Sequence, residues 1–203
     1  MTDLDEIDPR TTALLIVDYV RFVFEHHFHG DPAGLFSAAT AVLEAARQAG
    51  MLVVFVRPGF RDGYPEVSNR NKFAVALRES GSLLLSSPEV EIDPRVQPRP
   101  EEPIVTKHRR SVFPGTDIEQ ILRSRKVDSL ILAGIATGGA VLSTLCDAAD
   151  RDYRLFVLRD ACSDTDEEVH RFLLDKFFPR RGQVASSMEV VEAIKRASKS
   201  RNP

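Results

Sequence analysis

Short, unbroken apolar runs alternate with amphipathic segments along most of the chain. The runs have the length of β-strands, and each is expected to be covered on both faces because it lacks the apolar–polar alternation of a half-exposed strand. The predicted strands are Thr12 to Asp18, Met51 to Arg57, Ile104 to Lys107, Asp128 to Gly134, Arg154 to Leu158 and Gln183 to Ser186. Such runs are typical of a parallel sheet buried between two layers of helices.

Segments with apolar residues at helical spacing lie between the predicted strands. They are Ala33 to Gly50, Asn71 to Glu79, Asp117 to Arg125, Gly138 to Arg151, Asp166 to Phe178 and Met188 to Ala197. This alternation predicts an α/β fold with three layers, α/β/α, around a five- to six-stranded parallel sheet of Rossmann-like topology. A chain of 203 residues suits one core of this kind, so we expect a single domain over residues 1–203.

Two stretches interrupt the alternation. The residues that follow Asp18 include several histidines and are expected to form a loop. Residues 60–103 are rich in Pro, Gly and Ser, and the prolines between residues 94 and 103 favour extended or turning backbone. We expect this second stretch to be an excursion from the sheet and a candidate lid or subunit interface.

Charge and cysteine content narrow the range of partners. The 27 Lys and Arg against 30 Asp and Glu give a net charge of −3, which would not attract nucleic acid or an anionic membrane. No apolar run approaches the roughly 20 residues that a spanning helix needs. Two cysteines cannot form a disulfide framework and no signal-peptide pattern opens the chain, so we expect a cytoplasmic protein with a small-molecule substrate.

Residues suited to chemistry follow three of the strands. Asp18 and Lys107 end two apolar runs, and a glycine-rich turn, Ile135 to Ala140, follows a third. The carboxyl ends of parallel strands meet at one edge, where a nearby ammonium would lower the pKa of the carboxyl and desolvation would raise it. The turn could present backbone N–H groups to an anion. The alternatives are that Asp18 caps a loop, that Lys107 is solvated and that the turn serves only for packing. The glycine spacing fits neither of the nucleotide-binding motifs GxGxxG and GxxxxGK(S/T).

Three ordered motifs resemble those of the isochorismatase-like hydrolases, also called the cysteine hydrolase superfamily. They are ALLIVD ending at Asp18, VTKHRRSVFPGTDIEQIL around Lys107, and LILAGIATGGAVLSTLCDAADRDYRLFVLRDACSD from Leu130 to Asp164. The similarity extends from about Thr11 to Val184. The family includes nicotinamidases, carbamoylsarcosine amidohydrolases and isochorismatases.

The resemblance implies a role for each strand end. In the family an Asp is the general acid/base, a Lys stabilises charge and a Cys is the nucleophile. Asp18 and Lys107 match the first two, and Ala140 occupies the position of the nucleophile. The family's non-proline cis peptide would lie between Ile135 and Ala136, and the N–H groups of Ala136 and Ala140 would form an oxyanion hole.

Alanine at position 140 closes the covalent route, because it has no nucleophilic atom. Cys146 is about 240° around and about 9 Å along the predicted helix, so we expect it, like Cys162, to be structural. The resemblance implies that family members without the Cys cleave a vinyl ether after protonation by the Asp. The sequence thus predicts Asp-dependent hydrolysis of a small carboxylated, isochorismate-like molecule; the alternative is a non-catalytic member that binds a metabolite or partner.

Several side chains near the strand ends are candidate substrate contacts. Aromatic residues that could line an apolar pocket, or equally belong to the core, are Phe22, Phe24, Phe28 and Phe60. Arg57 and Arg61 could bind a substrate carboxylate bidentately or be solvated. Thr137 and Gly138 in the glycine-rich turn are further candidates.

The histidines do not predict a metal site. By the resemblance, nicotinamidase-type sites use an Asp and two His after the second strand, where this chain has RPGFRDG; His26, His27 and His29 lie elsewhere. We therefore expect no metal and no cofactor, with His27 or His29 as a candidate substrate contact. His108 is expected to point away from Lys107 and pack. Because the family is commonly oligomeric, a homo-oligomer, dimer or tetramer, is expected.

Overall fold

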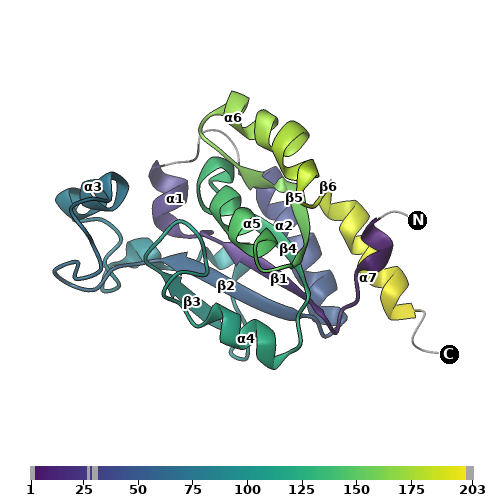
Figure 1. Ribbon diagram of the computed structural model, residues 1–203. Coiled ribbons are helices and arrows are strands. Elements are labelled where there is room, and N and C mark those ends of the chain that lie inside the picture. The colour runs from purple at the N-terminus through teal and green to yellow at the C-terminus, as the bar shows by residue number, and fades with distance from the viewer. Residues whose placement is uncertain (1–2, 27, 29–31, 200–203) are drawn as a thin grey trace.

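A computed structural model describes residues 3–26, 28 and 32–199, and its centre is a six-stranded parallel sheet (Figure 1). The strands are β1 Thr12–Val17, β2 Leu52–Pro58, β3 Ile104–Lys107, β4 Ser129–Ile135, β5 Arg154–Ser163 and β6 Gln183–Ala185. They lie in the order β3-β2-β1-β4-β5-β6, and every neighbouring pair is parallel. The predicted sheet is confirmed, with β1 and β4 at its centre.

Helices cover both faces of the sheet. The α-helices are α1 Arg21–His26, α2 Ala33–Gln48, α3 Lys72–Ser80, α4 Ile118–Ser124, α5 Leu142–Ala149, α6 Glu167–Phe172 and α7 Ser187–Lys199. Single turns of 3-10 or π-helix are η1 Asp3–Glu6, η2 Pro88–Val90, η3 Pro94–Val96, η4 Thr137–Val141, η5 Leu173–Phe177 and η6 Phe178–Arg180. None of the helices in the described ranges is long and apolar enough to cross a membrane.

The unbroken apolar strands arise because each side of the sheet carries its own core. Along β1, Leu14 and Ile16 pack in a cluster with α2 and α7, whereas Leu15 and Val17 pack in a cluster with α4 and α5. All six residues of β1 are buried. Successive side chains of a strand point to opposite faces, so burial on both faces requires an apolar residue at every position. This confirms the three-layer α/β/α architecture.

Three segments differ from the sequence-based expectation. Residues 21–26 form the short helix α1 rather than a loop, because Phe22 and Val23 are buried. The predicted helix from Gly138 begins instead with the π-helical turn η4. Strand β5 continues past Leu158 to Ser163. Two charged residues, Arg159 and Asp160, interrupt the apolar run of this strand. The Asp160 carboxylate is not left without partners, because it accepts hydrogen bonds from the Ser187 N–H and Oγ at the start of α7.

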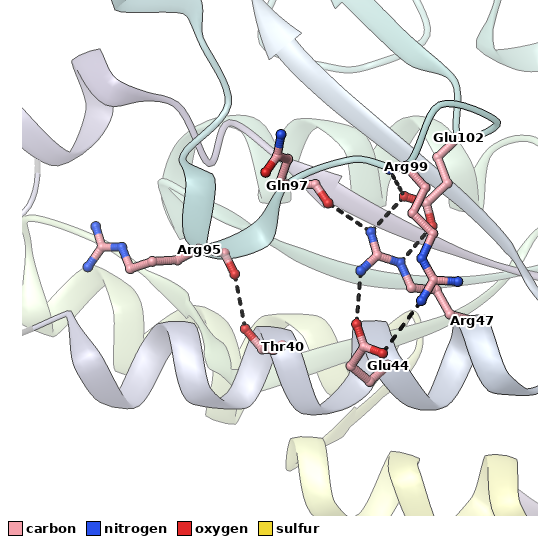
Figure 2. A network of polar contacts seen from close by, with 7 residues as sticks. All are labelled: Thr40, Glu44, Arg47, Arg95, Gln97, Arg99 and Glu102. Atoms are coloured by element: carbon pink, nitrogen blue, oxygen red, sulfur yellow. Dashed lines mark hydrogen bonds and ion pairs between the residues drawn. The ribbon is translucent and has the colours of Figure 1, made fainter.

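The end of the excursion between β2 and β3 is fastened to α2 by Arg47 (Figure 2). Its guanidinium donates to both carboxylate oxygens of Glu102, each at 2.7 Å, and to the Gln97 carbonyl at 2.9 Å. The same group donates to Glu44 on α2 at 2.9 Å. The Arg47 and Glu102 side chains are 9% and 7% exposed. This buried pair fixes the chain just before β3, the strand that carries Lys107.

Gly134, near the end of β4, leaves room for the following turn on one side and for β1 on another. A Cβ atom there would lie 2.8 Å from Val141 Cγ2 and 3.1 Å from Val17 Cβ. Contacts this short require the turn or the strand to move, and overpacking of a core costs about 1–3 kcal/mol. The position of the turn therefore depends on the absence of a side chain at residue 134.

We predict that Gly134→Ala lowers the free energy of unfolding by about 1–3 kcal/mol, measured by urea denaturation. Gly34→Ala is the matched control, because Gly34 is exposed in α2 and a Cβ there meets nothing within 4 Å. In this helical position alanine is expected to be neutral or stabilising by up to about 1 kcal/mol. Equal stability of the two variants would contradict the close packing of the turn.

Candidate active site

Asp18 and Lys107 form a buried ion pair at the carboxyl edge of the sheet. Asp18 directly follows β1, Lys107 ends β3, and β2 lies between these two strands. Lys107 Nζ is 2.9 Å from Asp18 Oδ2, and the two side chains are only 5% and 9% exposed. Lys107 also donates to the Arg109 carbonyl at 3.2 Å. The structure thus brings together the two charged residues that the sequence placed at strand ends.

The backbone of Asp18 turns sharply as it leaves the sheet. Its N–H still donates to the Val56 carbonyl of β2 at 2.9 Å, which continues the strand pairing by one residue. Its φ angle is +60°, in the left-handed region that few residues other than glycine occupy, although Asp tolerates it better than most. This change of direction ends the strand at the residue whose side chain meets Lys107.

The carboxyl of Asp18 is in an unusual electrostatic environment. Burial raises its pKa above the ordinary value of 3.8, while the charge and hydrogen bond of Lys107 act in the opposite direction without cancelling the increase. Its Oδ1 atom is buried and has no hydrogen-bond partner within the described residues. Asp18 lines a cavity, so this carboxyl combines a pKa above that of an ordinary aspartate with an oxygen that has no protein partner.

The glycine-rich turn after β4 forms the neighbouring wall of the cavity. The peptide bond between Ile135 and Ala136 is cis, at the position implied by the resemblance. The Ala136 carbonyl accepts hydrogen bonds from the N–H groups of Gly139 and Val141, at 3.0 and 3.3 Å. Ala136 and Ala140 both line the cavity, and Ala140 is 5% exposed. The position of the expected nucleophile therefore faces the same space as Asp18.

Two further side chains hold this turn in place. The Gly138 N–H donates to Asp164 Oδ2 at 2.6 Å, and Thr137 Oγ1 lies 2.8 Å from His170 Nδ1. Asp164 follows β5 directly, and His170 is on α6. Like Asp18 and Lys107, Asp164 lies at the carboxyl end of a strand. The sequence did not reveal it as a candidate because β5 was predicted to end at Leu158. No sequence signal paired His170 with the turn.

The cavity has a volume of about 400 Å³ and mixed walls. Asp18 and Lys107 contribute charge, and Phe22 and Phe60 contribute apolar surface. Arg110, which the sequence analysis did not single out, also lines it. This size suits a small organic molecule, and the combination of a mostly apolar wall with a few polar groups is typical of ligand sites.

The predicted substrate contacts are divided between the cavity and other places. Phe22, Phe60 and Gly138 line the cavity, whereas Thr137 is fully buried behind it with its hydroxyl on His170. The other candidates lie away from the cavity, where Phe24 packs between Tyr19 and Phe36, Phe28 packs on Phe24, Arg57 donates to Thr106 Oγ1 and Arg61 pairs with Glu66. His27 and His29 lie outside the described residues, so their predicted contact stays a prediction.

His108 packs, as expected, but it also lines the cavity, which the sequence did not predict. Strand β3 ends at Lys107, so the alternation of side chains does not extend to the next residue. His108 Nδ1 forms a hydrogen bond with the Gly59 carbonyl, and its ring lies 6.0 Å from that of Phe60. It is thus held as part of the wall.

Neither cysteine is placed to react with a ligand in the cavity. Cys162 is buried, and burial raises the pKa of its thiol to about 12. Cys146 is half-buried and packs against the core on α5. Neither residue lines the cavity. In the described part of the chain, no group of three or more His, Cys, Asp or Glu side chains could hold a metal ion.

Comparison with known proteins agrees with the fold. The isochorismatase domain family matches residues 12–189. An uncharacterised isochorismatase family protein of Bacillus subtilis, YwoC, is 28% identical over 189 residues, covering 93% of this chain and 97% of the relative. The ureidoacrylate amidohydrolase RutB of Caulobacter vibrioides is 31% identical over 196 residues, covering 85% of this chain and 87% of RutB.

A solved structure shows the same similarity. A cysteine hydrolase from Pseudomonas syringae pv. phaseolicola superposes with a TM-score of 0.86 at 27% identity, covering 94% of this chain and 95% of that one. The match of the family includes all three strand-end motifs, from Asp18 to the turn after β4. The chain therefore belongs to the isochorismatase family of hydrolases.

Proposed function

We propose that this protein hydrolyses a small carboxylated molecule by acid–base chemistry at Asp18, without a covalent enzyme intermediate. The observation that carries the proposal is the buried Asp18–Lys107 pair in a cavity whose nucleophile position holds Ala140. A methyl group at residue 140 cannot attack a substrate, so the reactive groups left are the carboxyl and a water molecule. Isochorismate-like enol ethers are the leading substrate class.

The chemistry of an enol ether suits a carboxyl in its acid form. Protonated Asp18 gives its proton to the methylene carbon of the enolpyruvyl group, and the carbon bearing the ether oxygen becomes an oxocarbenium ion. Water adds there, the resulting hemiketal breaks its bond to the alcohol, and the products are pyruvate and that alcohol. The water's proton returns to the carboxylate, which Lys107 stabilises while it is charged. Burial raises the pKa of Asp18 and so favours the starting form.

Amide hydrolysis is a second candidate, favoured by the 31% identity to a protein named as a ureidoacrylate amidohydrolase. Without a nucleophile at residue 140, this route requires Asp18 to act in its charged form as a base toward water. The two reactions therefore need opposite protonation states of the same carboxyl. Their pH dependences distinguish them.

We predict that the purified protein releases pyruvate from isochorismate and that Asp18→Asn lowers kcat by about 10²–10⁴-fold, the usual contribution of a positioned acid. The control is Asp117→Asn, the same chemical change at an exposed residue before α4, which should leave kcat unaltered. Absence of release from the wild-type protein would remove this substrate and support a non-catalytic, metabolite-binding member of the family.

The pH profile should show which form of Asp18 acts. For enol-ether hydrolysis, kcat is expected to be constant at low pH and to fall as pH rises through the pKa of Asp18. Because burial raises this pKa, the fall should begin above the 3.8 of an ordinary aspartate. A kcat for ureidoacrylate that instead increases through the same pH range would favour the amide route.

We also predict that iodoacetamide leaves the hydrolytic activity unchanged. Cys162 is protected by burial and its raised pKa, and Cys146 does not line the cavity. Ala140→Cys provides the positive control, because it introduces a thiol into the cavity wall that the reagent should label and block. Labelling is measured by mass spectrometry and activity by pyruvate release. Loss of wild-type activity on labelling would establish a cysteine-dependent mechanism.

A further inference from the structure

Arg110 occupies the mouth of the cavity on a chain segment just after β3. Its guanidinium carbon lies 4.1 Å from the centre of the Phe73 ring, which α3 contributes. The Phe73 side chain lines the cavity although the residue is 48% exposed. In Figure 1 helix α3 stands apart from the body of the molecule. A guanidinium stacked on a ring keeps its N–H edge free for hydrogen bonds.

The same guanidinium lies against the glycine-rich turn. A Cβ atom at residue 139 would be 2.8 Å from Arg110 Nη1, so the absence of a side chain at Gly139 leaves room for this nitrogen. The contact places the positive charge beside the residue that precedes Ala140. The Arg110 charge and the turn with the expected oxyanion donors thus share one corner of the cavity.

The other charged groups around the cavity are already engaged. Lys107 is paired with Asp18, and Arg109 donates to the carbonyls of His108 and Glu66. Asp164 accepts hydrogen bonds from the N–H groups of Gly138 and Asp166. Within the described residues, the Arg110 guanidinium forms no ion pair with a carboxylate. Arg109, which also lines the cavity, has its N–H groups engaged by carbonyls, whereas Arg110 has neither a hydrogen bond nor an ion pair in the part of the chain that the structure describes, so its N–H groups are available to a ligand.

We propose that Arg110 binds the carboxylate of the ligand and makes the cavity selective for carboxylates with a flat apolar body. This inference rests on the proposed function in that the ligand is a small carboxylated molecule. The guanidinium offers two parallel N–H donors, the geometry that a carboxylate accepts. Phe73 and the apolar wall inside the mouth would contact the body of the ligand, leaving its other end toward Asp18.

Binding of benzoate and benzamide, measured by isothermal titration calorimetry, tests the proposal without relying on catalysis. The two molecules have nearly the same shape, but only benzoate carries a charge at neutral pH. The wild-type protein is expected to bind benzoate at least about tenfold more tightly than benzamide, which corresponds to a difference of about 1.4 kcal/mol in binding free energy. Arg110→Gln should remove this preference, and Arg110→Lys should retain only part of it because an ammonium cannot bind bidentately.

Two further variants distinguish a specific contact from a general effect of charge. Arg125→Gln makes the same charge change at an exposed residue after α4 and should keep the wild-type preference. Phe73→Leu removes the stacked ring and should weaken benzoate binding by roughly two- to fivefold, as expected for an exposed cation–π contact. Circular dichroism spectra and thermal unfolding confirm that each variant is folded before titration.

The proposal is overturned if Arg110→Gln keeps the preference for benzoate, or if the folded wild-type protein shows no preference or no benzoate binding. Its failure is distinguishable from that of the proposed function. Pyruvate release together with an Arg110-independent preference would contradict only the role of Arg110. An Arg110-dependent preference in a protein that releases no pyruvate would contradict only the reaction.

Discussion

The ion pair between Asp18 and Lys107 is the interaction on which the candidate site depends. It joins the ends of two strands separated by β2, and it places both charges where the side chains are less than a tenth exposed. Removing two charges from water is costly, and their attraction repays this only when the geometry is good. The fold meets this requirement because the register of three parallel strands brings both residues to the same edge. Burial of the Asp18 carboxyl raises its pKa, and the charge of Lys107 offsets only part of this increase.

The turn after β4 has a different physical basis. It is shaped by missing side chains, since Gly134 permits contact with β1 and Gly139 leaves space for Arg110. Asp164 accepts a hydrogen bond from the Gly138 N–H, and His170 on α6 contacts the Thr137 hydroxyl. A turn held in this way from both sides can keep its backbone donors in place whether residue 140 carries a thiol or a methyl group. The proposed non-covalent chemistry needs the framework of the turn and the carboxyl, but no nucleophile.

The fold was predictable because burial on both faces of the sheet requires unbroken apolar runs, and these runs are visible in the sequence. Asp18 and Lys107 were predictable for a related reason, because each ends such a run. Asp164 was missed because Arg159 and Asp160 interrupt the apolar run of β5, although the strand continues beyond them. Arg110 could not be ranked from sequence, because its position depends on how the irregular segment after β3 folds over the edge of the sheet. The contact between Phe73 and Arg110 joins this segment to α3, which is distant in the sequence.

The most direct test of this account is the protonation state of Asp18 itself. In protein labelled with ¹³C at the aspartate carboxyl carbons, the Asp18 signal can be assigned by its loss in Asp18→Asn and followed by NMR as the pH changes. The account predicts a midpoint above the ordinary 3.8, because burial outweighs the effect of Lys107. A midpoint at or below that value would mean that Lys107 keeps the carboxyl charged, and it would contradict the proposed role of Asp18 as an acid.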